Sequence, residues 1–523
     1  MRSPKMLSLR AAMLAAALIV LLNFAAVSAD AAVRAKVDMA PSIAGVEGTI
    51  SGRLLVFMKK AGKETDGFGP EYDDPNAVWV SGIEVNDLAP GKTVDFDADT
   101  LSFPTPFAQA PAGEYQFFAL LDRDHSYTYS GPGGGDVYSG VVKTSMPANE
   151  VSLTLIKMIP VRTPMTNPNA HVVEFESPML SAFWGRPIMM QATVVVPPGY
   201  DKSSQKYPTV YSIHGYGGTH LSNLPGVDNF VKSMTEGKRP EMIYVYLNAH
   251  NSLGHHVFAD SVNNGPWGTA LVKEFIPYLE KQFRMDAKPS GRFLTGHSSG
   301  GWSSLWVMIT HPDFFAGTWS TSPDPTDFRN FTGPDITKFP PQNAYADASG
   351  KDYGLVRVGG KDVATVRQYA QQERVLGSYG GQFGSFNAVF SPKGPDGQPM
   401  PLFDVETGRI DPFVEKAWEK YDISRVLREN WRTLGPKLRG KLHLYVGTAD
   451  TFHLDESLRL LDAELKTLGS DARVEYLEGR THFDLYKDGL GEKMAWEMYK
   501  VARPGAKAAT KYFPRGRPGL VLA

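Results

Sequence analysis

Cysteine is absent from this chain of 523 residues. Without cysteine the chain can form no disulfide, offers no thiolate to a metal and has no cysteine nucleophile. A protein of this kind that is exported has to be held together by its core, and apolar residues make up 42% of the sequence. An enzyme of this composition that attacks its substrate covalently needs another nucleophile, such as a serine.

The chain also has no large excess of positive or negative charge. The chain has 54 lysines and arginines against 56 aspartates and glutamates, a formal net charge of −2. This balance gives no electrostatic reason to expect a nucleic-acid partner. Beyond residue 30 the chain also lacks the run of about 20 apolar residues that a membrane-spanning helix requires. We therefore expect no stable membrane span in the mature chain.

The first 29 residues have the pattern of a cleaved secretory signal peptide. Arg2, Lys5 and Arg10 form a basic region, the apolar run 11–22 follows, and small residues stand at 27–29. The apolar run is short for a membrane span, and an uncleaved anchor is the alternative interpretation. The sequence therefore predicts a mature protein that is periplasmic or secreted.

Residues 30–160 consist of short apolar runs, such as 54–58 and 115–120, between turns rich in proline and glycine. Short strands at regular spacing with such turns are typical of an antiparallel β-sandwich. We predict an N-terminal β-sandwich module over this range. The sequence does not separate a structural role for it from a glycan-binding one.

Residues 161–505 alternate between strand-like and helical segments. This alternation predicts an α/β domain in which a mostly parallel sheet has helices on both faces. It stops between about 324 and 438, where the one clear helix lies near 412–431. An insertion of this length is often a lid over a site. Residues 506–523 are expected to be a C-terminal tail.

The most informative local pattern is Gly296-His297-Ser298-Ser299-Gly300. It fits G-x-S-x-G, a sharp strand-to-helix turn that exposes a nucleophilic serine. A short apolar run at 291–295 precedes it, and large apolar residues at helical spacing follow it. Because strand and helix flank the turn in the required order, Ser298 is the predicted nucleophile.

A serine needs a base, and the base needs an orienting acid. Asp450 follows a predicted strand at 441–446, and His482 follows the last predicted strand at 473–477. The carboxyl ends of parallel strands meet at one edge of a sheet, where active sites collect. His482 is therefore the predicted base and Asp450 the predicted acid. Asp450 as a helix cap, and Asp324 as the acid in its place, remain alternatives.

A glycine-rich segment, His214-Gly215-Tyr216-Gly217-Gly218, follows another predicted strand. A loop of this kind exposes backbone N–H groups to a developing oxyanion. The expected donors are the N–H groups of Ser299 and Tyr216, with Gly215 or Gly217 as alternatives for the second. An ordinary glycine-rich turn is the other interpretation.

Several ring-bearing side chains are candidates for the substrate pocket, namely His214, His297, His256 and Trp302. The loop that holds His250, His255, His256 and Asp260 also contains residue types that bind zinc. Adjacent histidines point in different directions, and no HExxH spacing supports a shared site. We predict neither a metal nor a cofactor.

Taken together, these segments resemble the putative esterase family of α/β-hydrolases, which includes S-formylglutathione hydrolases and feruloyl, acetyl-xylan and enterochelin esterases. The resemblance covers about 177–500 apart from the insertion, and rests on the segments 194–200, 214–215, 274–280, 296–301, 447–450 and that around His482. It implies an α/β-hydrolase fold with Ser298 as nucleophile, Asp450 as acid and His482 as base.

The resemblance does not carry a substrate identity, because the elbow reads His-Ser-Ser-Gly-Gly and the insertion is long for the family. A β module ahead of such a domain resembles enterochelin- and polysaccharide-ester hydrolases, which points to a bulky or carbohydrate-linked ester. The predicted function is an exported serine ester hydrolase that forms an acyl-enzyme. An acyltransferase with the same triad, a catalytically inert glycan- or peptidoglycan-binding protein, and a peptidase are the alternatives.

Overall fold

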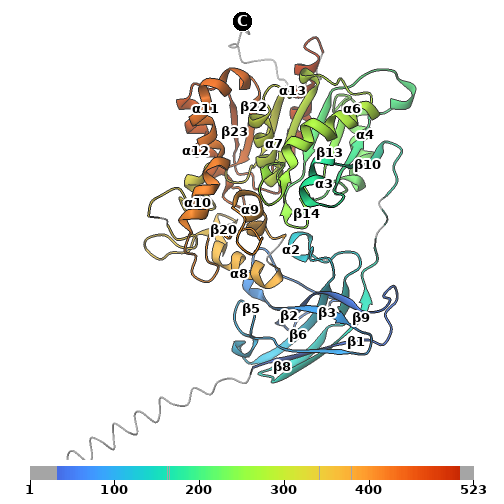
Figure 1. Ribbon diagram of the computed structural model, residues 1–523, viewed down its shortest axis with the longest axis vertical. Helices are drawn as coiled ribbons and strands as arrows, with labels where there is room; N and C mark the ends of the chain where they lie inside the picture. The colour runs from blue at the N-terminus through green and yellow to red at the C-terminus, as the bar shows by residue number, and fades with distance from the viewer. Residues whose placement is uncertain (1–31, 162, 164, 341, 378–379, 507–523) are drawn as a thin grey trace, which may run out of the picture.

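The computed structural model describes residues 32–161, 163, 165–340, 342–377 and 380–506. The predicted signal peptide and most of the predicted tail lie outside these residues. Figure 1 shows the β-rich N-terminal module below the C-terminal half, in which helices surround a second sheet. No helix within the described ranges has the length and apolar character needed to cross a membrane.

The N-terminal module contains nine strands in the order β4-β1-β9-β7-β6-β2-β3-β5, with β8 paired to β6. Within the described residues, every pair of neighbouring strands in this sheet is antiparallel except β1 with β9, which is parallel. The expectation of a wholly antiparallel module is wrong for this pair, because its strands come from opposite ends of the module and no hairpin sets their direction. The strands are β1 (Arg34–Met39), β2 (Ile50–Lys60), β3 (Val78–Leu88), β4 (Thr93–Asp97), β5 (Ser102–Phe103), β6 (Gly113–Asp122), β7 (Val137–Ser139), β8 (Val142–Met146) and β9 (Glu150–Met158).

Both faces of β2 and β6 are buried. Leu54 and Phe117 on one face share a core with side chains of β1 and β9. Leu55 on the other face packs with the short helix α2 (Tyr127–Ser130) and with the end of α8 (Val366–Leu376), which belongs to the predicted insertion. The module is therefore packed against the C-terminal half.

The second sheet has the order β10-β11-β13-β12-β18-β19-β22-β23. The β10–β11 and β11–β13 pairs are antiparallel and all later pairs are parallel, so the prediction of a mostly parallel sheet is confirmed. The strands are β10 (Ala170–Glu176), β11 (Met189–Val195), β12 (Thr209–Ile213), β13 (Ile243–Leu247), β18 (Arg292–His297), β19 (Gly317–Thr321), β22 (Leu442–Gly447) and β23 (Arg473–Leu477).

Helices cover this sheet on both faces (Figure 1). Neighbouring residues Val194 and Val195 of β11 point into two different cores. The core on the Val194 side includes α5 (Trp267–Ala270), α6 (Ile276–Gln282), α7 (Ser299–Thr310), α12 (Leu454–Thr467) and the start of the sheet-flanking α3 (Pro178–Trp184). The core on the Val195 side includes α4 (Val227–Thr235) and α13 (Leu490–Ala502). Between β13 and α5 lie the short strands β14 (His250–Asn251), β15 (Gly254–His255), β16 (Asp260–Ser261) and β17 (Gly265–Pro266).

The insertion between β19 and β22 is more structured than the sequence predicts. It holds the hairpin β20 (Gly354–Val358) and β21 (Lys361–Thr365), then α8, α9 (Gln382–Phe390), α10 (Pro412–Trp418) and α11 (Ile423–Leu438). The expected single helix is therefore two helices, and α8 and α9 were missed. α9 is hidden from sequence analysis because it is apolar on most sides and has no amphipathic period.

Candidate active site

Ser298 lies on the turn between β18 and α7, half-buried, with φ 60° and ψ −127°. An L-residue rarely adopts this conformation, and it is typical of a strained functional turn. The flanking glycines allow the turn, since a Cβ on Gly296 would lie 2.1 Å from the Gly300 carbonyl oxygen. The predicted elbow is thus present with strand before and helix after.

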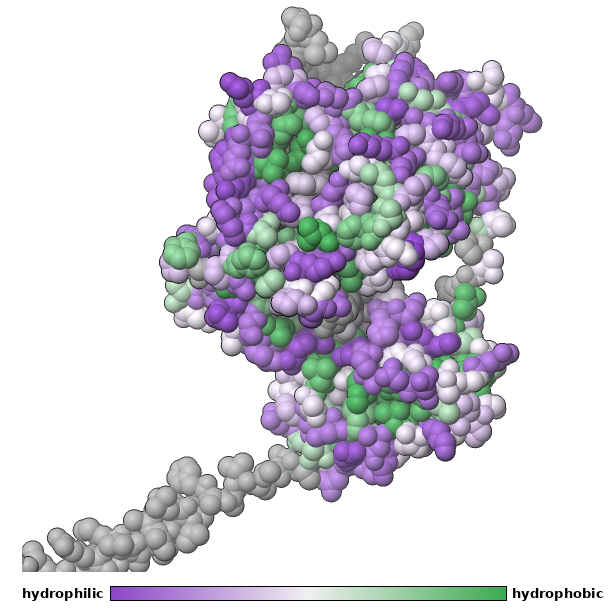
Figure 2. All heavy atoms as spheres, in the orientation of Figure 1, coloured by the Kyte–Doolittle hydropathy of each residue, from purple (hydrophilic) through white to green (hydrophobic). Residues whose placement is uncertain are grey.

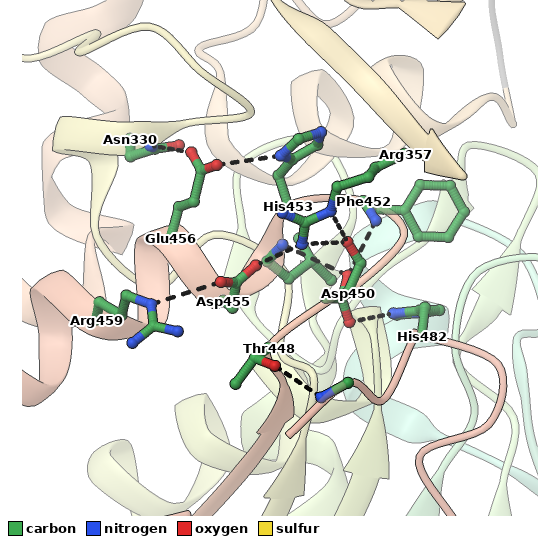
Figure 3. A network of polar contacts seen from close by, with 12 residues as sticks. Asn330, Arg357, Thr448, Asp450, Phe452, His453, Asp455, Glu456, Arg459 and His482 are labelled. Atoms are coloured by element: carbon green, nitrogen blue, oxygen red, sulfur yellow. Dashed lines mark hydrogen bonds and ion pairs between the residues drawn. The ribbon is translucent and has the colours of Figure 1, made fainter. Parts of the chain in front are cut away.

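Asp450 and His482 come from the ends of neighbouring strands β22 and β23. The His482 Nδ1 lies 3.0 Å from the Asp450 Oδ2, and the two side chains are 5% and 0% exposed (Figure 3). Burial alone would raise the pKa of Asp450, but hydrogen bonds from His482 and from the Phe452 N–H outweigh it and hold that pKa below its usual value. An ionised carboxylate that orients an imidazole is the arrangement expected of an acid–base pair.

Arg357 of β20 holds the backbone at Asp450 in place. Its guanidinium donates to the Asp450 carbonyl oxygen at 2.8 Å and to the Asp455 carboxylate at 3.0 Å (Figure 3). The contact joins the insertion to the loop after β22. Sequence reasoning missed Arg357, because no local pattern links two residues so far apart in the chain.

Asp324, the alternative acid, follows β19 and points toward the nucleophile instead of the imidazole Nδ1. Its Oδ2 accepts from the Ser299 hydroxyl at 2.6 Å, and its Oδ1 accepts from the Ser298 hydroxyl at 3.4 Å. Burial raises the pKa of Asp324 to about 6, against opposing effects of Ser299, His482 and Ser298. A carboxyl group with a raised pKa, beside a nucleophile, is a mark of a functional site.

Substitution of Asp324 by asparagine is expected to stabilise the fold near neutral pH. The pKa of Asp324 in the folded state, about 6, lies above the ordinary aspartate value of 3.8, so the folded state binds more protons than the unfolded state and loses stability as the pH rises through this window. Asp324→Asn should raise the free energy of unfolding by up to about 3 kcal/mol at pH 7.5 and by little below pH 4. Denaturant unfolding at both pH values measures the effect, and an equal effect at both would contradict it.

The glycine-rich segment at 214–218 lies directly against the nucleophile. A Cβ on Gly215 would lie 3.2 Å from the Ser298 Cβ. His214 supports the segment from below: its Nε2 accepts the Ala249 N–H at 2.8 Å, and its Nδ1 is 2.8 Å from the Gly215 carbonyl oxygen. Burial lowers the pKa of His214 to about 4, so the ring is neutral. The short distance between Gly215 and Ser298 is compatible with a loop whose N–H groups donate to an oxyanion.

The other predicted pocket residues lie at different depths. The His297 ring is half-buried, with its centroid 4.3 Å from that of His482. Trp302 is 2% exposed and stacks on Trp306, and His256 is 0% exposed and stacks on Trp267 at 3.8 Å. A pocket-lining role for these residues stays a prediction.

The loop considered for zinc does not bring its side chains together. Among the described residues, the one group of three potential ligand side chains is Asp122, Asp124 and Asp136 in the N-terminal module. Backbone N–H groups of Ser126, Tyr127, Arg123 and Gly133 already donate to the two buried carboxylates of this group. These bonds are typical of loop capping.

Comparison with known proteins identifies the family of this chain. A sequence model described as putative esterase matches residues 186–461, more than half of the chain, so the family resemblance is confirmed. A curated esterase of Mycobacterium tuberculosis is 29% identical over 129 residues, which cover 25% of this chain and 28% of that protein. The match therefore spans little more than a quarter of the length of that relative.

Two solved structures are similar to about two thirds of this chain. A ferulic acid esterase has a TM-score of 0.42 and 16% identity, with 64% of this chain and 100% of that chain covered. An S-formylglutathione hydrolase from Agrobacterium tumefaciens has a TM-score of 0.38 and 16% identity, with coverages of 65% and 97%.

Proposed function

Because this chain belongs to the putative esterase family, we propose that it is a serine carboxylic ester hydrolase that works through an acyl-enzyme on Ser298. One observation carries the proposal: a serine on a strained elbow shares one sheet edge with a buried Asp450–His482 pair. Nucleophile, orienting acid and base follow one another along the chain in the order Ser, Asp, His that is typical of α/β-hydrolases.

In the first half of the reaction, the Ser298 hydroxyl turns from Asp324 toward His482, which takes its proton. The serine oxygen then attacks the ester carbonyl carbon. The N–H groups of Ser299 and Tyr216 donate hydrogen bonds to the carbonyl oxygen and stabilise the negative charge that develops on it. Ser299 is the first residue of α7, whose dipole favours an anion at that end. The carbon–oxygen bond to the alcohol breaks, and His482 gives its proton to the leaving alcohol.

In the second half, His482 removes a proton from water, and the resulting hydroxide attacks the acyl carbon. The bond to the Ser298 oxygen breaks, the acid leaves, and the serine regains its proton from His482. Asp450 stays ionised throughout and stabilises the imidazolium that forms twice per cycle. No metal or cofactor takes part in these steps.

The biological setting belongs to the same proposal. The basic and apolar pattern of residues 1–29 supports export to the periplasm or beyond. The β-rich module at the N-terminus, which we interpret as a β-sandwich ahead of an α/β-hydrolase domain, supports a bulky or carbohydrate-linked ester as the substrate.

A panel of 4-nitrophenyl and alkyl esters tests the proposal, with acyl length and leaving group varied separately. We expect turnover of several members and stoichiometric labelling of the protein by a fluorophosphonate. The panel is repeated with methanol or glycerol present, because an acyltransferase would form the new ester in place of the free acid. Absence of both turnover and labelling would favour the inert binding protein.

A further inference from the structure

The short helix α2 of the N-terminal module is held firmly at the end of β6. The Asp122 carboxylate accepts the N–H groups of Ser126 and Tyr127 at 3.2 and 3.0 Å. These bonds fix the start of the helix, and Tyr127 and Tyr129 within it are both buried. α2 is thus a rigid projection of the module.

This projection ends on the glycine-rich loop 214–218. The Tyr129 hydroxyl donates to the Gly218 carbonyl oxygen at 2.9 Å. The Tyr129 ring stacks on His250 with centroids 4.1 Å apart and meets the Tyr216 ring edge-on at 4.9 Å. A residue of the module therefore contacts both the loop and the hairpin behind it.

The loop reaches back to the module through Tyr216. Its hydroxyl oxygen lies 2.5 Å from the Thr128 carbonyl oxygen and 2.9 Å from that of Gly380 in the insertion. Burial raises the pKa of Tyr216, so its hydroxyl keeps the proton that it donates to these carbonyls. The loop is pinned between module and insertion.

Hydrogen bonds at its start also hold the loop: the Gly218 N–H donates to the Gly215 carbonyl oxygen at 3.1 Å, and the His255 Nε2 lies 2.9 Å from the His214 carbonyl oxygen. Three of its five residues are glycines, and Gly217 has a φ of 78°. Glycine backbones are freely variable unless neighbours hold them. Gly215 lies against Ser298, so a shift of the loop moves its N–H groups relative to the substrate carbonyl.

We propose that Tyr129 and Tyr216 are positioning residues, which hold loop 214–218 so that its N–H groups meet the oxyanion formed at Ser298. The N-terminal module then contributes to the geometry of the active site and is not an independent accessory domain. This inference rests on the proposed function.

Other contacts attach the module without reaching the loop. Arg53 donates to the Val375 carbonyl oxygen at 2.7 Å, and the Tyr369 hydroxyl donates to the Tyr72 carbonyl oxygen at 2.6 Å. In Figure 2 the two halves touch on one side and are separated by an opening on the other. These contacts through α8 attach the module to the C-terminal half without touching loop 214–218. The contacts of α2 are the ones that reach this loop.

The test compares Tyr129→Phe and Tyr216→Phe with Tyr369→Phe. All three remove one tyrosine hydroxyl that donates to a backbone carbonyl where module and C-terminal half meet. We expect the first two to lower kcat by about 10- to 100-fold with KM changed less than threefold, because a misplaced oxyanion donor acts in the transition state. Tyr369→Phe should leave both constants within twofold.

The affinity for ketone inhibitors separates a positioning role of Tyr129 and Tyr216 from a purely structural one. A trifluoromethyl ketone, which forms an oxyanion adduct with a serine, should lose affinity in the first two variants by the same factor as kcat. The matching methyl ketone, which forms no stable adduct, should bind equally to all. Equal kinetics and equal ketone affinities in all three variants would overturn the inference.

Hydrogen exchange of the loop keeps this test separate from the proposed function. Tyr129→Ala should speed exchange of the amides at 214–218 at least tenfold, and Tyr369→Phe should not. Unchanged exchange in Tyr129→Ala overturns the positioning role, whatever the activity. A wild-type protein that a fluorophosphonate does not label would instead overturn the proposed function.

Discussion

Ser298→Ala is expected to lower kcat/KM for short aryl esters by about 10⁴- to 10⁶-fold, because removal of the nucleophile removes the acyl-enzyme route. The substitution takes away one half-buried hydroxyl whose bond to Asp324 is long, at 3.4 Å. The folded structure should therefore persist, with an unfolding midpoint close to that of the wild type. Steady-state kinetics and thermal unfolding of the same preparation measure both effects.

Ser303→Ala is the matched control for this variant. Ser303 is a buried serine one turn further along α7, and its hydroxyl donates within the helix to the Ser299 carbonyl oxygen at 2.6 Å. It should keep most of the activity. A Ser298→Ala protein that is folded and retains more than a hundredth of wild-type kcat/KM would show that another group is the nucleophile.

The second large effect is expected from Asp450→Asn, which should lower kcat by about 10³- to 10⁴-fold. The amide can still contact His482, but it cannot stabilise the imidazolium and favours the wrong tautomer. The Phe452 N–H donates to the Asp450 Oδ1, which the amide oxygen of asparagine replaces, and Arg357 donates to the Asp450 carbonyl oxygen, which the substitution leaves in place, so the loop should keep its shape. Kinetics on a single aryl ester, with substrate well above KM, give the loss.

Asp324→Asn provides the comparison that assigns the acid. Both carboxylates stand at the ends of neighbouring strands, β19 and β22, and both lie near the base. Since Asp450 accepts from His482 Nδ1 and Asp324 does not, Asp450→Asn should be the more damaging by at least tenfold. The reverse order would assign the role of acid to Asp324.

The strand and helix around Ser298 could be predicted from the sequence, and so could the positions of Asp450 and His482 after two neighbouring strands. Each of these depends on a local pattern: an apolar run, a glycine turn, and a polar residue directly after a strand. Because parallel strands end at one edge, three local patterns that are distant in the chain could be placed together without coordinates.

The side chains that hold the candidate site residues in place could not be predicted from local patterns. Arg357 reaches Asp450, and Tyr216 reaches Thr128, across segments that no spacing rule connects. The parallel pairing of β1 with β9 has the same origin, since it joins the two ends of the module. Such contacts depend on how helices and strands pack against one another. The local patterns of a single sequence do not show this packing.

Fragment-resolved mass spectrometry of the trapped enzyme tests the central claim most directly. After reaction with a fluorophosphonate, or quenching during turnover of a slow ester, one adduct per chain should be found on the peptide that contains Ser298 and Ser299. Fragment ions between these two neighbours should assign it to Ser298. An adduct on Ser299 or on any other residue, or hydrolysis with no covalent intermediate, would contradict the account.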